Sequence, residues 1–154
     1  PKLCAQSAVL MDASTGRILY GKEETIKRPM ASTTKIMTCI LALEQGNPED
    51  MVGISSYAAS MPDVQLNIRG GEKYRLQDLL YSLMLESHND SAVAVAEHNG
   101  GTVEGFAEMM NQKARDNGCT DTCFVTHNGL DGTRQAEGEP HSTTAAYLAR
   151  HMGY

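Results

Sequence analysis

The chain has 154 residues, of which 41% are hydrophobic and 21% charged, a composition typical of one globular domain with a sizeable core. Its formal net charge is −6 and no cluster of Lys and Arg occurs, which argues against nucleic acid or another polyanion as a partner. No apolar run approaches the length that spans a bilayer. The histidines and cysteines lack the spacing of metal ligands, so we expect neither a metal nor a cofactor.

A β-hairpin is expected at the start of the chain, followed by helices. Residues 6–12 and 17–22 are predicted to form its two strands, with Gly16 relieving the turn between them. Thr102 is the expected N-cap of a helix, and residues 47–74 and 118–141 are expected to be rich in loops. Apolar periodicity and terminal signals predict helices at about 32–45, 75–86, 90–98, 103–116 and 142–151. The fold class is therefore α+β.

The most informative stretch is Ser32-Thr33-Thr34-Lys35, at the predicted start of the first helix. Residues three apart share one face of a helix, so we expect the Lys35 amine to reach the Ser32 hydroxyl. Ser32 would lie in the first turn, where its backbone N–H and the helix dipole favour a developing oxyanion. Lys35 is a general base only when neutral, which requires burial or a nearby cation to lower its pKa. The alternative is an N-cap at Ser32 and a solvated Lys35.

A second candidate site is Ser87-His88-Asn89, in the link between the second and third predicted helices. A rigid link of this kind presents the Ser87 hydroxyl for a proton relay and the Asn89 carboxamide for a substrate carbonyl. The alternative is helix punctuation, since Ser and Asn are favoured N-cap residues. His88 is expected to face solvent as a bystander.

Both motifs lie within longer segments of a recognisable type, namely residues 8–20, 28–35, 71–90, 106–111, 128–131 and 141–145. In this order and spacing they resemble serine-type D-alanyl-D-alanine carboxypeptidases, which are low-molecular-weight penicillin-binding proteins of the serine β-lactamase superfamily. The resemblance covers nearly the whole chain. It implies the N-terminal portion of the β-lactamase/transpeptidase-like fold.

The resemblance also assigns roles to the motif residues. It makes Ser32 the acylated nucleophile, Lys35 its proton acceptor, and Ser87 with Asn89 the second catalytic motif, which also binds substrate. In the assembled site it implies a buried Lys35 amine in contact with Ser32, Ser87 and Asn89. The implied activity is removal of the terminal D-alanine from peptidoglycan stem peptides through an acyl-enzyme, and β-lactam antibiotics would acylate the same serine. No metal or cofactor is implied. The implied location is extracytoplasmic, where peptidoglycan lies, with the leader and any membrane anchor outside this chain.

One motif of the family is missing, because no Lys-Thr-Gly triplet occurs in the sequence. We therefore expect a single incomplete domain, with the first two sheet strands in residues 1–25 and a helical region carrying two motifs in residues 26–154. Alone, this chain is expected to show little activity. A serine β-lactamase of the same fold and a noncatalytic interaction module are the alternative functions.

The expected two-stranded sheet would keep an unpaired edge, which favours self-association of the chain. The apolar residues expected to lose part of their cover are Val9, Met11, Ile18 and Tyr20. The disulfide state of the cysteines stays open. Cys39 is expected to be a small core residue, whereas a Cys119–Cys123 bridge would close a geometrically demanding ring and Cys4 is unassigned.

Overall fold

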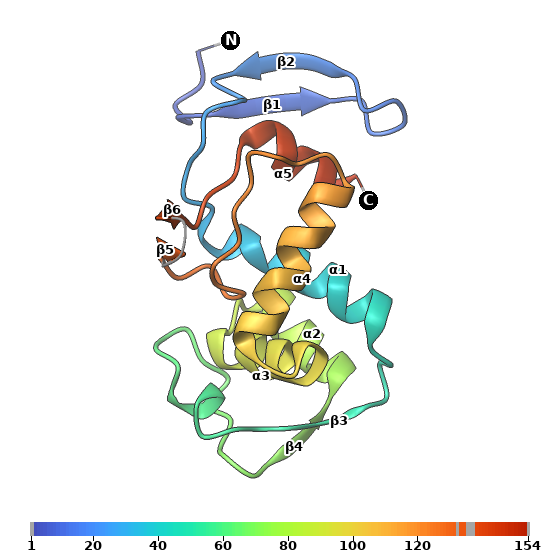
Figure 1. Cartoon of the computed structure of the whole chain (residues 1–154), viewed down its shortest axis with the longest axis vertical. Helices are drawn as coiled ribbons and strands as arrows, with labels where there is room; N and C mark the ends of the chain where they lie inside the picture. The colour runs from blue at the N-terminus through green and yellow to red at the C-terminus, as the bar shows by residue number, and fades with distance from the viewer. Residues whose placement is uncertain (1, 132, 135–137, 154) are drawn as a thin grey trace.

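The N-terminal hairpin is present in the computed structural model, which describes residues 2–131, 133–134 and 138–153 (Figure 1). Strands β1 (Ala8–Met11) and β2 (Ile18–Lys22) pair antiparallel, with a register irregularity after Leu10. Gly16 adopts a φ of 70° in the connecting turn, a left-handed conformation that glycine tolerates without a Cβ penalty. The predicted hairpin is therefore confirmed, although its first strand is shorter than expected.

All five predicted helices are confirmed, with differences at their ends. The fourth matches residue for residue, because the Thr102 hydroxyl accepts a hydrogen bond from the Gly105 N–H and caps it. A 3₁₀ turn, η1 (Ala31–Thr33), precedes the first helix. The fifth begins three residues later than expected, because its N-cap is Thr144. The helices are α1 (Thr34–Gln45), α2 (Leu76–Leu85), α3 (Asn89–Gly100), α4 (Val103–Asp116) and α5 (Ala145–Met152).

The segments predicted as loops contain short elements that the sequence did not indicate. They are the strand pair β3 (Met51–Gly53) with β4 (Lys73–Arg75), the 3₁₀ turn η2 (Ala58–Ser60), and the pair β5 (Thr133–Arg134) with β6 (Glu139–Pro140). Strands of two or three residues are too short to show a period of two, so nothing in the pattern distinguishes them from loops. Residues 132 and 135–137 of the second predicted loop lie outside the described residues.

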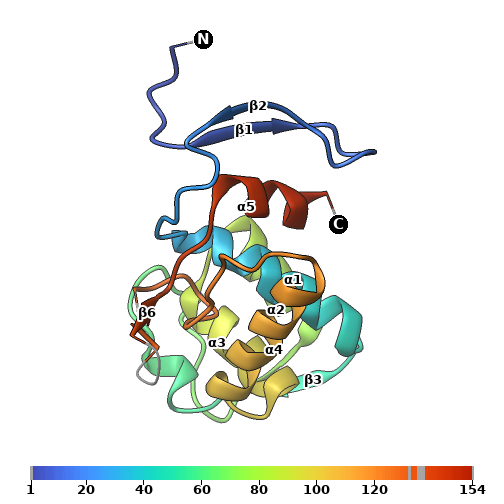
Figure 2. The same cartoon turned by 45° about the horizontal axis from the view of Figure 1, so that its top comes forward.

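The elements are stacked in the order hairpin, α5 and helical region. The hairpin lies across α5, and α5 separates it from α1 and the other helices (Figures 1 and 2). The three antiparallel pairs of the described residues each form a separate two-stranded sheet. Within the described residues, no helix combines the length and the apolar character needed to cross a membrane.

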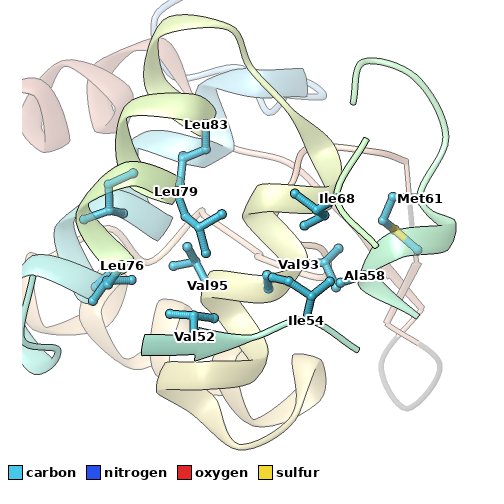
Figure 3. Close-up of a cluster of buried hydrophobic side chains, with 13 residues drawn as sticks. Val52, Ile54, Ala58, Met61, Ile68, Leu76, Leu79, Leu83, Val93 and Val95 are labelled. Atoms are coloured by element: carbon cyan, nitrogen blue, oxygen red, sulfur yellow. The ribbon is translucent and has the colours of Figure 1, made fainter. Parts of the chain in front are cut away.

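Two groups of buried side chains hold the helical region together. The first joins α2 and α3 to β3 and the 54–68 segment (Figure 3), and its fully buried members include Val52, Leu76 and Val93. Cys39 is half-buried against this group, and burial raises the pKa of its thiol, as expected for a core residue. Each buried Leu or Val of this kind contributes about 1.5–3 kcal/mol relative to an exposed one.

The second group packs the other side of α1 against α4 and the segment 119–124, through Met37, Leu41, Phe106, Met110 and Phe124. Helices α1 and α3 supply side chains to both groups. The two helices that carry the candidate site residues are therefore fixed from two sides, which makes them a rigid mount for the side chains at their N-terminal ends.

Candidate active site

Ser32 and Lys35 are brought together at the start of α1. Ser32 lies in the η1 turn with its side chain exposed, whereas Lys35 lies in the first turn of α1 and is only 2% exposed. The Lys35 Nζ is 3.2 Å from the Ser32 Oγ, within hydrogen-bond distance. The alternative of a solvated lysine is therefore wrong, and the N-caps of η1 and α1 are Met30 and Thr33 rather than Ser32.

The Lys35 amine is surrounded by three oxygen acceptors. Besides Ser32 Oγ, its Nζ lies 2.9 Å from Asn89 Oδ1 and 2.7 Å from the Asn128 carbonyl oxygen. Burial lowers the pKa of Lys35 from its ordinary 10.5 to about 8, because desolvation penalises the ammonium form. A neutral amine has two N–H donors and one lone pair. The two donors match Asn89 and Asn128, which leaves the lone pair for the Ser32 hydroxyl.

Asn89, the first residue of α3, is buried and fully hydrogen-bonded. Because its Oδ1 accepts from Lys35, its amide group must point the other way, where Nδ2 lies 3.2 Å from the Pro62 carbonyl and 3.1 Å from the Asp63 carbonyl. The Asn89 N–H also donates to the Val64 carbonyl. Asn89 therefore connects the Lys35 amine to the segment 62–64.

Ser87 occupies the link between α2 and α3 with a left-handed backbone, φ 62°, and is half-buried. It lines a pocket of about 310 Å³ together with Ser32, Lys35 and apolar residues that include Leu83 and Met84. Among the described residues, no hydrogen bond joins Ser87 to Lys35. Of the expected cluster, Ser32 and Asn89 are hydrogen-bonded to Lys35, whereas Ser87 only lines the same pocket as Ser32 and Lys35.

His88 differs from the sequence-based expectation. It is half-buried rather than solvent-facing, and its Nδ1 lies 2.8 Å from the Ser82 Oγ, which in turn lies 2.7 Å from the Ser91 Oγ. These bonds tie the imidazole to α2 and to the first turn of α3. His88 therefore stabilises the link that carries Ser87 and Asn89.

Several residues that support the site were missed by the sequence analysis. The Asn128 contact is made by a backbone carbonyl, which every residue type has, so no residue pattern marks it. The neighbouring Gly129 was a usable signal. Its φ is 91°, and a Cβ at this position would lie 2.0 Å from the Ala31 carbonyl oxygen, so only glycine allows the segment to approach the η1 turn.

A buried carboxylate was also missed. Asp90 is 1% exposed, and its two oxygens accept hydrogen bonds from the backbone N–H groups of Leu66, Ile68 and Ser91. The sequence analysis identified Asp90 only as the first residue of a predicted helix. In the structure it docks the segment 64–68 onto α3, next to Asn89. Within the part of the chain that the structure describes, no group of His, Cys, Asp and Glu is arranged to hold a metal ion.

Solved structures show which class of protein has this fold. A D-alanyl-D-alanine carboxypeptidase from Mycobacterium tuberculosis superposes over 99% of this chain and 56% of its own, with a TM-score of 0.91 and 29% identity. The carboxypeptidase DacD of Francisella tularensis covers 99% of this chain and 37% of its own, with a TM-score of 0.89 and 33% identity. The fold is that of the penicillin-binding proteins and serine β-lactamases.

The family follows from the sequence comparisons. Residues 1–153 match the model of the D-alanyl-D-alanine carboxypeptidase family, peptidase family S11, and the chain belongs to this family. It is 39% identical over 131 residues to the D-alanyl-D-alanine carboxypeptidase DacF of Bacillus subtilis, covering 82% of this chain and 34% of the relative. It is 36% identical over 143 residues to DacA of Haemophilus influenzae, a match that covers 88% of this chain and 36% of the relative. The chain thus spans little more than a third of the length of these two relatives.

Proposed function

We propose that the protein removes the terminal D-alanine from peptidoglycan stem peptides that end in D-alanyl-D-alanine, through an acyl-enzyme on Ser32. One observation carries the proposal: the exposed Ser32 hydroxyl lies 3.2 Å from a buried lysine amine whose pKa is lowered to about 8. At pH 7 about one Lys35 in ten is then neutral, compared with fewer than about one in a thousand for a free lysine. A poised amine beside an accessible hydroxyl is the arrangement of an activated nucleophile.

The first half of the reaction is acylation. Neutral Lys35 takes the Ser32 proton while the Ser32 Oγ attacks the carbonyl carbon between the two D-alanines. The backbone N–H of Ser32, in the turn before α1, faces the developing oxyanion. Collapse of the tetrahedral species breaks the peptide bond, and Ser87 relays a proton from Lys35 to the leaving amine of D-alanine.

The second half is hydrolysis of the ester. A water molecule gives its proton to the neutral Lys35 and adds to the acyl carbon, and Ser32 leaves as the alkoxide that takes the proton back. Asn89 is proposed to bind the substrate's amide carbonyl through Nδ2. In the structure both N–H groups of Nδ2 are engaged by Pro62 and Asp63, so binding by Asn89 requires one of these two bonds to be exchanged for the substrate.

The names of the relatives support this substrate class. The relatives from Bacillus subtilis and Haemophilus influenzae are named D-alanyl-D-alanine carboxypeptidases, and a structural neighbour from Haemophilus influenzae is penicillin binding protein 5. β-Lactam antibiotics are accordingly proposed as inhibitors that acylate Ser32. Because the proposed substrate is peptidoglycan, the proposed location is extracytoplasmic.

The function is tested by incubating the full-length gene product with a peptide ending in L-lysyl-D-alanyl-D-alanine and measuring released D-alanine. Release by the wild type and none by Ser32→Ala is the expected result. Ser60→Ala, at an exposed serine far along the chain, is the matched control and retains activity. Undiminished release by Ser32→Ala contradicts the proposal, and rapid turnover of penicillin without D-alanine release indicates a β-lactamase instead.

We further propose that the 154-residue chain by itself associates with a second copy through the β1–β2 hairpin. Among the described residues this sheet has two strands, so each strand has one edge without a strand partner. Of the apolar residues expected to lose part of their cover, Ile18 is 40% exposed, and Val9, Met11 and Tyr20 are half-buried. Leu10 and Leu19, which were not among them, are more exposed, at 57% and 56%.

A further inference from the structure

His141 is a buried histidine that no step of the proposed reaction uses. It is 3% exposed and lies between the segment 124–126 and the start of α1. Its ring packs edge-on against Phe124, with centroids 6.0 Å apart. Its ring nitrogens are hydrogen-bonded to Val125, Thr126 and Thr34, and Thr34 is in turn hydrogen-bonded to the η1 turn that contains Ser32.

The hydrogen bonds of His141 determine which nitrogen carries the proton. Its Nδ1 lies 3.0 Å from the Val125 backbone N and 3.4 Å from the Thr126 backbone N. A backbone N–H can only donate, so Nδ1 must present its lone pair. The proton of the neutral ring is then on Nε2, which lies 2.7 Å from the Thr34 Oγ1 and donates to it.

The chain of donors continues to the residue before Ser32. Because the Thr34 hydroxyl accepts from His141, its own proton is directed to the Ala31 carbonyl oxygen, 2.7 Å away. Ala31 has a φ of 45°, a left-handed conformation that a residue with a Cβ adopts only when its surroundings enforce it. The conformation of Ala31 sets where the next residue, Ser32, begins.

We propose that His141 is a positioning residue, which through Thr34 holds Ala31 in its left-handed conformation and so places the Ser32 hydroxyl against Lys35. The inference deepens the proposed function and rests on it. The series of hydrogen bonds runs in one direction, from the backbone N–H groups of Val125 and Thr126 through His141 and Thr34 to the Ala31 carbonyl. Every donor in it has an acceptor and both ends are backbone groups, so it transfers no proton to the reaction.

The charge state of His141 supports a fixed structural role. Burial lowers the pKa of His141 to about 4 and outweighs the opposing effect of the Asp131 carboxylate. Burial lowers the pKa of the neighbouring His127 to about 4 as well, and repulsion by Lys35 and His141 in their protonated forms adds to this effect. Near neutral pH the His141 ring is therefore uncharged. Its effect on acylation is expected to be constant across the pH range in which Lys35 titrates.

The test uses the full-length gene product and the rate of acylation by a chromogenic penicillin. His141→Phe keeps an aromatic ring beside Phe124 but removes the hydrogen bonds to Val125, Thr126 and Thr34. Thr34→Val removes the hydroxyl at constant shape. Thr34→Ser keeps the hydroxyl and is the rescue control. His151→Phe is the matched histidine control, because His151 is also buried against Phe124, at 6.2 Å between centroids.

A misplaced nucleophile lowers the saturating acylation rate constant without changing reversible binding. We expect His141→Phe and Thr34→Val each to lower that rate constant by about 10–100-fold, with an unchanged half-saturating penicillin concentration. The double variant should be no slower than either single variant, because both substitutions interrupt the same series of hydrogen bonds. Thr34→Ser and His151→Phe should stay within about threefold of wild type. The fold loss should be the same on both sides of the Lys35 pKa.

The outcomes separate this inference from the proposed function. Wild-type acylation with an equally fast, folded His141→Phe variant overturns the inference and leaves the function standing. A wild-type protein that no penicillin acylates overturns both. A ¹⁵N NMR spectrum of the histidine side chains tests the geometry without any activity: the expected result is a protonated Nε2 and an unprotonated Nδ1 at His141. The opposite tautomer overturns the inference whatever the acylation rates.

Discussion

At the scale of single residues, the burial of Lys35 lowers the pKa of its amine and so raises the fraction that is neutral. Its Nζ has acceptors at Asn89 and Asn128 for two N–H groups and faces Ser32 with the remaining position. A charged ammonium would fill all three positions with donors, leaving nothing to take the serine proton. Only the neutral form has a lone pair directed at Ser32, so in the proposed mechanism the protonation state of Lys35 controls whether Ser32 is activated.

This control predicts the pH dependence of acylation. The pKa of Lys35 is lowered from 10.5 to about 8, so the reactive neutral fraction grows as the pH rises through about 8. We expect the acylation rate constant for penicillin to rise along a single titration curve with that midpoint and then level off. Stopped-flow or quenched-flow measurements across this range check it. A rate constant that is flat over the range would contradict Lys35 as the base.

Removing the amine is the complementary test. Lys35→Ala should slow acylation by about 10²–10⁴-fold, the usual cost of losing a general base. Lys73→Ala is the control, since Lys73 lies on the exposed edge of β4, away from the site, and it should acylate at the wild-type rate. Equal rates for the two variants would show that Lys35 has no role in proton transfer.

Two buried histidines near the site predict an acid-sensitive fold. Burial lowers the pKa of His127 and of His141 from 6.5 to about 4. The unfolded chain therefore binds more protons than the folded chain between these values, and the free energy of unfolding decreases as the pH falls through this window. For each histidine, the free energy of unfolding decreases by on the order of 3 kcal/mol as the pH falls from 6.5 to about 4.

Urea denaturation at a series of pH values measures this effect. In a folded His141→Phe variant the decrease in unfolding free energy over the same window should be smaller than in the wild type, because one titrating group is gone. A wild-type unfolding free energy that does not change between pH 6.5 and about 4 would contradict the assigned burial of both histidines.

The sequence predicted part of the site at this scale and missed part of it. The spacing of Ser32 and Lys35 was sufficient because both lie on consecutive turns at one helix end, where local geometry determines their contact. The Asn89 contact required the packing of α3 against α1, which only the family resemblance implied. The Asn128 carbonyl lies 93 residues from Lys35 in sequence and has no side-chain signature, so the only local signal for this contact was the neighbouring Gly129.

At the scale of elements, the η1 turn is held by the segment that follows α4. Gly129 is the point of closest approach, where a Cβ would lie 2.0 Å from the Ala31 carbonyl oxygen. Gly129→Ala should therefore displace the turn, lower the acylation rate and destabilise the fold. Gly71→Ala is a matched control, because Gly71 has a φ of 88° but open space around its missing Cβ.

The control isolates the clash from the backbone strain. Gly71→Ala is expected to cost about 1–2 kcal/mol, the strain of a left-handed alanine, and to leave acylation unchanged. Gly129→Ala should cost more than this and slow acylation. Chemical denaturation and penicillin acylation measure the two effects. If both variants lose the same stability and acylate alike, the contact between Gly129 and Ala31 does not constrain the nucleophile turn.

The elements themselves were predictable to different degrees. Helix α4 was predicted with both ends, because a capping threonine precedes it and an Asn-Gly pair follows it. The pairs β3–β4 and β5–β6 were not predicted. Each has only two or three residues per strand, and their pairing depends on where the helices place the connecting segments rather than on local propensity.

At the scale of the whole molecule, the hairpin lies at one end and packs on α5 (Figure 2). Its Leu10 and Leu19 side chains are 57% and 56% exposed. We expect the 154-residue chain to form dimers or larger species at increasing concentration, by light scattering coupled to gel filtration. Leu10→Lys with Leu19→Lys should shift it toward the monomer, because charged side chains oppose edge-to-edge pairing.

Leu43→Lys is the control for that experiment, since Leu43 is equally exposed, at 58%, but lies on α1 rather than on the hairpin. It should leave the association unchanged. A wild-type chain that stays monomeric at every concentration would contradict the proposed association, and an equal effect of the Leu43 variant would place the contact elsewhere on the molecule.

The central claim, that Ser32 is a nucleophile activated by Lys35, is tested most directly by locating the covalent adduct. The full-length gene product is treated with penicillin, digested and mapped by mass spectrometry. We predict a penicilloyl group on the peptide that contains Ser32, no adduct in Ser32→Ala, and an unchanged adduct in Ser60→Ala. An adduct that persists in the Ser32→Ala protein, or one mapped to a different residue, would contradict the account.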